Sequence, residues 1–117
     1  MSGLERQRQQ FLSQLTTSHR LEDPLAVYNS FIHWALQAYP PSDPNSGLIE
    51  LLEETTRKFK DDDAYKSDER YLDIWILYAN EVDKPSDVYK FCVKRGIGLT
   101  WGKFYEEYAR ALEMSGK

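Results

Sequence analysis

A chain of 117 residues with 41% hydrophobic and 14% aromatic residues is long enough for one core, but not for a core and an elaborate catalytic cleft. Its net charge of −4 comes without a basic stripe, which argues against a nucleic-acid binder. One cysteine and no signal peptide indicate the cytosol or nucleus, and no apolar run approaches the roughly 20 residues of a membrane span.

The first predicted element is a polar helix over residues 3–19. Its apolar residues are few, at Leu4, Phe11, Leu12 and Leu15. Two turns of near-heptad spacing are too short for a coiled coil. We therefore expect residues 1–20 to form an edge helix and residues 21–117 to form the helical domain.

Two helices with clear start signals follow. Asp23 is a good N-cap and Pro24 suits the first helical position, so a helix is predicted from there to Tyr39, which precedes two prolines. After a turn over residues 40–46, Ser46 is expected to cap a third helix. The acidic and basic residues of that helix form its solvated side, and its apolar side carries Leu48, Ile49, Leu51, Leu52, Thr55 and Phe59.

The next helix is the most apolar part of the chain, because only Asp73 is polar between Tyr71 and Ala79. At about 100° per residue, one broad core face carries Tyr71, Leu72, Ile74, Trp75, Tyr78, Ala79 and Val82. Ile76 and Leu77 fall on the opposite side, where an amphipathic helix would carry charges. We expect another helix layer or a partner protein to cover them.

The last two helices are predicted from Asp83-Lys84-Pro85 to Gly96, a left-handed cap, and from about Thr100 onward. One face of the last helix carries Trp101, Phe104, Tyr108 and Leu112. No following helix covers it in this sequence, and residues 115–117 have the composition of a turn before another helix. We therefore expect a fragment of a longer protein, able to dimerise through this face.

Six helices with short connections and no convincing strand predict an all-α fold. Aromatic residues at the packing positions of successive helix pairs favour a tetratricopeptide-like stack of antiparallel hairpins, although the repeat is not a clean 34 residues.

No catalytic, cofactor or metal site is predicted. The acidic run at residues 61–63 lacks the spacing of a calcium loop and is interpreted as a solvated loop. Cys92 has the apolar spacing of its helix, which favours a buried thiol over a nucleophile. His19 and His33 lie on different elements, without the spacing of metal ligands.

Several motifs occur together in a fixed order: Asp23-Pro24-Leu25, Ile32-His33-Trp34, Tyr39-Pro40, FKDDDAYKSDERYLDIW at Phe59–Trp75, and Gly96-Ile97-Gly98. This combination resembles the amino-terminal homology region of the Bub and Mad spindle-checkpoint proteins, and the resemblance covers roughly residues 21–110. It implies a non-catalytic, tetratricopeptide-like domain that acts in mitosis and chromosome segregation, in the nucleus, at kinetochores and in the cytoplasm.

The resemblance also implies partners: the kinetochore scaffold protein and other checkpoint proteins, which bind through short amphipathic helices. The positions that match the family's docking surface are Ile76, Ala79, Val82, Phe91 and Cys92, flanked by Arg95. The helical wheel supports Ile76 and adds Leu77, whereas it assigns Ala79 and Val82 to the core. The competing interpretation is that all of these residues pack internally.

Two alternatives stay open. The chain lacks the Lys-Glu-Asn box that Mad-type and BubR-type members carry, which favours the Bub-kinase type, with any kinase domain far downstream, over a Mad or BubR type whose box lies outside this segment. A different hypothesis is a tetratricopeptide-like scaffold from an unrelated assembly, such as a chaperone or RNA-processing complex.

Overall fold

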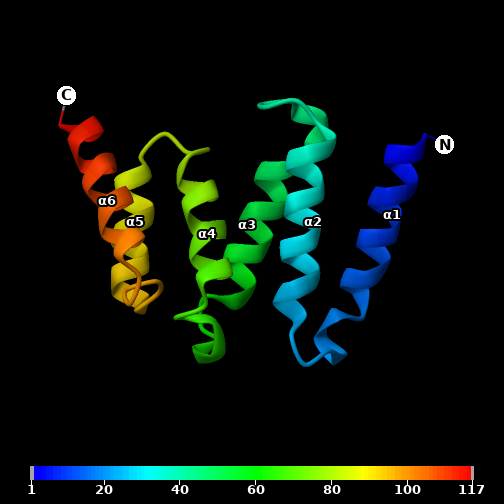
Figure 1. The fold of residues 1–117 in the computed structure, drawn as a ribbon, viewed down its shortest axis with the longest axis horizontal. Coiled ribbons are helices and arrows are strands. Elements are labelled where there is room, and N and C mark those ends of the chain that lie inside the picture. The colour runs from blue at the N-terminus through cyan, green and yellow to red at the C-terminus, as the bar shows by residue number, and fades with distance from the viewer. Residues whose placement is uncertain (1, 117) are drawn as a thin grey trace. The chain divides into compact units, whose positions relative to one another are not determined.

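The computed structural model describes residues 2–116, and within that range the chain is helical without strands. The α-helices are α1 (Gly3–Thr16), α2 (Pro24–Ala38), α3 (Leu48–Phe59), α4 (Glu69–Ala79), α5 (Pro85–Arg95) and α6 (Gly102–Ser115) (Figure 1). Three short 3₁₀ helices lie in the connections, at Ser18–Arg20, Pro44–Ser46 and Asp63–Tyr65. The all-α prediction is confirmed, and none of the described helices is long and apolar enough to cross a membrane.

The helix ends follow the local signals of the sequence, with small shifts. Pro24 occupies the start of α2, Tyr39 leaves the helix in an extended conformation, and Gly96 ends α5 at φ +74°. Ser46 lies two residues before α3, in a 3₁₀ helix, and its hydroxyl accepts a hydrogen bond from the Leu48 amide at 3.1 Å. The predicted turn at residues 115–117 differs as well: α6 continues to Ser115, and residue 117 lies outside the described range.

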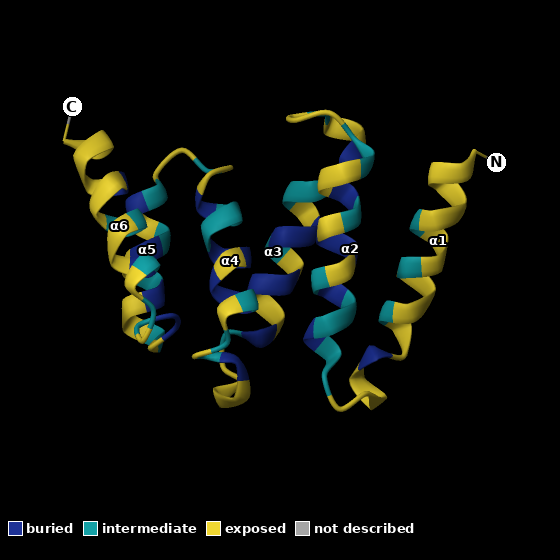
Figure 2. Ribbon diagram, in the orientation of Figure 1, coloured by how far each residue is buried: buried dark blue, intermediate teal, exposed yellow. Residues whose placement is uncertain are grey.

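The chain forms two compact units, Met1–Leu51 and Leu52–Lys117, and the boundary falls inside α3. This division does not coincide with the predicted boundary between residues 20 and 21. In the first unit, α1 lies antiparallel to α2 (Figure 1). Phe11 of α1 stacks on Phe31 of α2, with ring centroids 4.9 Å apart and an interplanar angle of 7°. Helix α1 buries none of its residues completely, as its colouring in Figure 2 shows.

A single guanidinium group ties α1 to the loop that follows α2. Arg8 donates hydrogen bonds of 3.0 Å to the Tyr39 hydroxyl and to the carbonyl oxygens of Asn45 and Ser46. The same group lies 5.4 Å from the centroid of the Trp34 ring, within the range of a cation–π contact. Polar contacts therefore hold this edge of the unit, where apolar burial is small.

In the second unit, α4 is the buried element. Tyr71, Leu72, Ile74, Trp75 and Ala79 are buried, as the helical wheel predicts, and the other two residues of that face are half-buried. The Tyr71 hydroxyl donates a 2.6 Å hydrogen bond to the carbonyl oxygen of Thr56 on α3. Burial raises the pKa of this phenol, so it stays a neutral donor.

Helix α6 corrects one expectation. The face predicted to be uncovered packs on α5: Phe104 is fully buried, and the Tyr108 ring stacks on the Tyr89 ring at 5.6 Å. Of the predicted face, Leu112 is the exposed member, and Trp101 donates a 2.8 Å hydrogen bond to the Ser67 carbonyl oxygen. A dimer through this face would bury little apolar surface, because α5 already covers most of it.

The turn between α5 and α6 contains a glycine that no other residue can replace without strain. Gly98 has φ +78°, and its amide donates a 2.8 Å hydrogen bond to the Lys66 carbonyl oxygen. A Cβ atom at this position would lie 2.7 Å from a methyl group of Leu72. Both the backbone conformation and the close approach therefore require glycine.

Candidate functional site

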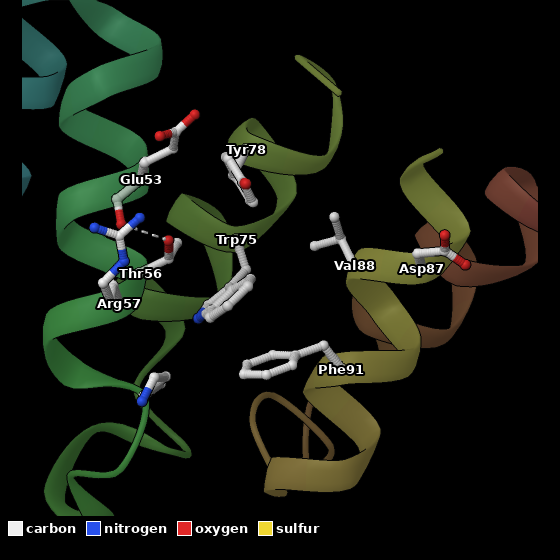
Figure 3. A pocket seen from close by; sticks show the side chains of 9 residues that line it. Glu53, Thr56, Arg57, Trp75, Tyr78, Asp87, Val88 and Phe91 are labelled. Atoms are coloured by element: carbon white, nitrogen blue, oxygen red, sulfur yellow. Dashed lines mark hydrogen bonds between the residues drawn. The ribbon is translucent and has the colours of Figure 1, made fainter. Parts of the chain in front are cut away.

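A hollow of about 330 Å³ lies between α3, α4 and α5 of the second unit (Figure 3). Its apolar surface comes from Trp75 and Tyr78 on α4 and from Val88 and Phe91 on α5. Trp75 and Phe91 stack with ring centroids 5.4 Å apart, and the Tyr78 ring meets Trp75 edge to face at 6.1 Å. We call this hollow, with its polar edge, the α3–α5 groove.

The α3 side of the groove is polar. The single hydroxyl hydrogen of Thr56 is directed back to its own helix, where the carbonyl oxygens of Leu52 and Glu53 lie 2.8 and 3.1 Å from the hydroxyl oxygen. Because that hydroxyl is satisfied internally, it does not require a polar partner. The charged residues that surround the apolar surface are Glu53, Arg57, Lys60 and Asp87.

The indole nitrogen of Trp75 is a buried donor without a well-aligned acceptor among the described residues, although it interacts with the Tyr71 hydroxyl. A buried N–H without a partner costs on the order of 1–3 kcal/mol. Such groups are rare in folded proteins, so their location is informative. This one belongs to a residue that lines the groove.

Beside the groove, Arg95 lies over the Phe91 ring at 5.1 Å and forms an ion pair with Asp61. Lys60 pairs with the same carboxylate at 3.0 Å. The hydrogen bond from Lys60, followed by the charge of Arg95, holds the pKa of Asp61 below its ordinary value. One carboxylate is thus shared by two cations at this end of the groove.

The structure brings together only part of the predicted docking surface. Phe91 lines the groove and Arg95 lies beside it, whereas Ile76 and Leu77 are half-buried residues that do not line it. Val82 lines a separate hollow of about 210 Å³ near Tyr89 and Met114. The seven predicted residues therefore do not form one surface.

Two of the predicted residues present no surface at all. Ala79 and Cys92 are fully buried, so a partner would not reach their side chains. Burial raises the pKa of the Cys92 thiol to about 12, which keeps it protonated at neutral pH. Cys92 is thus the buried, unreactive thiol that its spacing predicts.

Sequence reasoning missed Trp75, Tyr78 and Val88 as residues of the groove. The wheel assigned the first two to the core face of α4, and Trp75 is indeed almost completely buried. The two-sided apolar pattern of α4 points instead to Ile76 and Leu77, which do not line the groove, so the helical period carries no signal for it. The acidic run at residues 61–63 is exposed, and the described residues include no group of three or more His, Cys, Asp or Glu side chains placed to hold a metal ion.

Comparison with known proteins gives a family match over nearly the whole chain. Residues 6–117 match the family described as Mad3/BUB1 homology region 1. The chain is 39% identical to the mitotic spindle checkpoint component mad3 of Schizosaccharomyces pombe, over 99% of this chain and 38% of that protein. It is 36% identical to the mitotic spindle checkpoint protein BUBR1 of Arabidopsis thaliana, over 82% of this chain and 24% of that protein. Against the spindle assembly checkpoint kinase BUB1 of Saccharomyces cerevisiae, the identity is 30%, over 80% of this chain and 10% of that protein.

Two crystal structures resemble the chain. A chain of the mitotic checkpoint complex superposes with a TM-score of 0.92 at 40% identity, over 97% of this chain and 54% of that chain. The conserved N-terminal domain of the checkpoint component BUB1 superposes with a TM-score of 0.86 at 26% identity, over 97% of this chain and 63% of that chain. The tetratricopeptide-like fold is thereby confirmed. The identities to mad3 and to BUBR1 exceed that to the kinase BUB1, so they do not support the expected Bub-kinase type.

Proposed function

Because this chain belongs to the Mad3/BUB1 homology region 1 family, we propose that it is the protein-interaction module of a spindle assembly checkpoint protein. The homology region is the non-catalytic part of the family, and kinase activity lies elsewhere in some relatives. Membership of this family sets aside the alternative of a scaffold from a chaperone or RNA-processing assembly.

The module binds one amphipathic helix in the α3–α5 groove. The observation that carries this proposal is the apolar surface of Trp75, Tyr78, Val88 and Phe91, which lies open between three helices. A volume of about 330 Å³ is within the range of sites that hold a few large side chains. A helix that presents anchors at positions i, i+3 or i+4, and i+7 would fill it along one face.

The partners follow from the family. One similar structure is described as the mitotic checkpoint complex, which supports other checkpoint proteins as partners of this chain. We extend the proposal to short helical motifs of the kinetochore scaffold protein. The module would then act at kinetochores, and in the nucleus and cytoplasm of the dividing cell.

A second surface competes with the groove. Of the predicted docking residues, Ile76, Leu77 and Val82 lie outside the groove and are half-buried, so they keep some exposure away from it. Two matched substitutions separate the surfaces: Val88→Glu places a charge in the groove, and Ile76→Glu places one on the competing face. Both positions are half-buried apolar residues of the second unit.

The experiment measures binding of a labelled library of kinetochore-scaffold and checkpoint-protein peptides by fluorescence anisotropy. Circular dichroism and thermal unfolding establish that each variant is folded. We expect Val88→Glu to weaken binding at least tenfold, because the new carboxylate must be desolvated against Trp75 and Phe91, and Ile76→Glu to bind like the wild type.

Loss of binding with Ile76→Glu alone would reject the groove and assign docking to the other face. Absence of any binding by the wild type would reject docking of helical peptides by this module. If Val88→Glu unfolds the domain, Tyr78→Ala provides the same test with a truncation in place of a charge.

A further inference from the structure

The charges along the α3–α5 groove are ordered by sign. On the α3 side, Glu53 precedes Lys60, the residue that follows the end of α3, by seven residues, and on α5, Asp87 precedes Arg95, which lies beside the groove, by about two turns. Helices α3 and α5 run in the same direction, because α4 runs antiparallel to each of them (Figure 1). Both walls of the groove therefore begin with an acidic residue and end with a basic one.

These charges are not neutralised within the domain. Glu53, Arg57 and Asp87 form no ion pair with other described residues. At the other end, Lys60 and Arg95 share the single carboxylate of Asp61. The groove thus has two carboxylates, unpaired within the described chain, at one end and two cations that share one carboxylate at the other, with apolar surface between them.

We propose that the groove binds its helix in one direction, parallel to α3 and α5. The N-terminus of the bound helix lies beside Glu53 and Asp87, and its C-terminus lies beside Lys60 and Arg95. The side-chain charges favour this direction, because the positive end of the bound helix meets the carboxylates and its negative end meets the cations; these full charges exceed the partial charges at the ends of α3 and α5, whose parallel macrodipoles act in the opposite sense. This inference rests on the proposed docking function and adds the direction and the charge pattern of the partner.

The partner is an amphipathic helix with Lys or Arg in its first turn and Asp or Glu in its last turn. That order is unfavourable for a free helix, where acidic residues stabilise the first turn and basic residues the last. Selectivity of the groove for this order would therefore oppose the intrinsic helicity of the peptide. A difference in affinity of this sign cannot arise from better helix formation in solution.

The test uses two synthetic peptides of about 16 residues with identical apolar anchors and identical composition. The basic-first peptide carries Lys in the first turn and Glu in the last, and the acid-first peptide has these charges exchanged. By anisotropy at low ionic strength, we expect the basic-first peptide to bind about fivefold to tenfold more tightly. Added salt should reduce this difference, because the charges at the edge of the groove are solvated.

A charge-reversed domain sharpens the test. Glu53→Lys, Asp87→Lys, Arg57→Glu and Lys60→Glu in one chain should invert the preference between the peptides. The matched control, Glu54→Lys with Lys58→Glu, reverses exposed charges of α3 outside the groove and should leave the preference unchanged. A nitroxide on the N-terminus of the basic-first peptide should broaden the backbone NMR signals of Glu53 and Asp87 more than those of Lys60 and Arg95.

The outcomes separate this inference from the proposed function. If both peptides bind equally, if the acid-first peptide binds more tightly, or if the nitroxide broadens the signals at the basic end, the direction is overturned while docking stands. If neither peptide binds and the peptide library also fails to bind, the docking function itself is wrong.

Discussion

The hairpin of α1 and α2 and the group of α4, α5 and α6 are built from the same kind of helix but held together differently. Helix α1 has no fully buried residue, and Arg8 attaches it through three hydrogen bonds and contacts with two aromatic rings. In the second unit, Phe104 and Cys92 are completely enclosed, and Tyr89 packs against both Phe104 and Tyr108. The hairpin shows how an edge helix is kept in place by polar contacts when little apolar surface is buried.

This difference matters for function, because the groove lies within the unit that has the enclosed aromatic core. Trp75 and Phe91 line the groove and also belong to a chain of ring contacts that reaches Phe59 through Tyr71. The floor of the groove is therefore formed by residues that also pack against the core. A preformed apolar floor reduces the ordering cost of binding.

The largest expected effect compares a phenylalanine from each unit. Phe104 is fully buried and Phe11 is half-buried. We expect Phe104→Ala to lower the free energy of unfolding by about 3–5 kcal/mol and Phe11→Ala by about 1–2 kcal/mol, because the second residue loses less buried surface and leaves a smaller cavity. Urea unfolding followed by circular dichroism measures both. Equal losses would show that the edge hairpin is as tightly packed as the second unit.

A smaller effect is expected when the Arg8 guanidinium, which attaches α1 to the rest of the first unit, is removed. Arg8→Ala should destabilise the first unit by about 1.5–3 kcal/mol, because hydrogen bonds from a charged donor are lost. Amide hydrogen exchange should show faster exchange in α1 and unchanged exchange in α4. Arg6→Ala is the matched control, since Arg6 is an exposed residue on the same helix. Unchanged exchange in α1 of the Arg8 variant would mean that the aromatic stacking alone suffices.

The smallest expected effect is a loss of stability at alkaline pH, and the groups that cause it lie in the second unit alone. Burial raises the pKa of the Cys92 thiol from 9.0 to about 12, and burial, followed by the charge of Glu107, raises the pKa of Tyr89 from 10.0 to about 12. The unfolded chain loses these protons first, so the stabilisation is complete below about pH 9 and declines as the pH rises toward 12. Between pH 8 and pH 10 we expect a loss of about 1–2 kcal/mol.

Urea unfolding at a series of pH values measures how the free energy of unfolding falls with rising pH. Cys92→Ala should remove the larger part of this fall up to pH 10. The thiol also gives an independent measurement. A colorimetric thiol reagent should react with Cys92 only at the rate of unfolding, and rapid labelling of the folded protein would contradict its burial.

Much of the fold could be predicted from the sequence, because helix ends depend on neighbouring residues. Pro24, Tyr39 and Gly96 are where their local preferences place them. The buried face of α4 was also predictable from its period, and the family from the motifs at Phe59–Trp75, which the match over residues 6–117 confirms.

The groove could not be predicted in the same way, because it depends on how three helices meet. A helical wheel assigns Tyr78 to the core, but it does not show that α3 and α5 leave this residue half-exposed. The wheel likewise identifies no packing partner for Phe104, although α5 packs against this residue. Periodicity identifies apolar faces, and only the tertiary arrangement shows which faces remain open.

Glycine can be required at a position because φ is positive or because a Cβ atom would clash. The two glycines at the end of α5 show these requirements separately. Gly96 and Gly98 both have positive φ, but a Cβ atom at Gly96 would meet no heavy atom within 4 Å, whereas one at Gly98 would meet Leu72. At Gly96, handedness is therefore the only obstacle. A D-alanine introduced there by chemical synthesis has the mirror-image preference, so this backbone should accept it and gain stability from the reduced freedom of the unfolded chain.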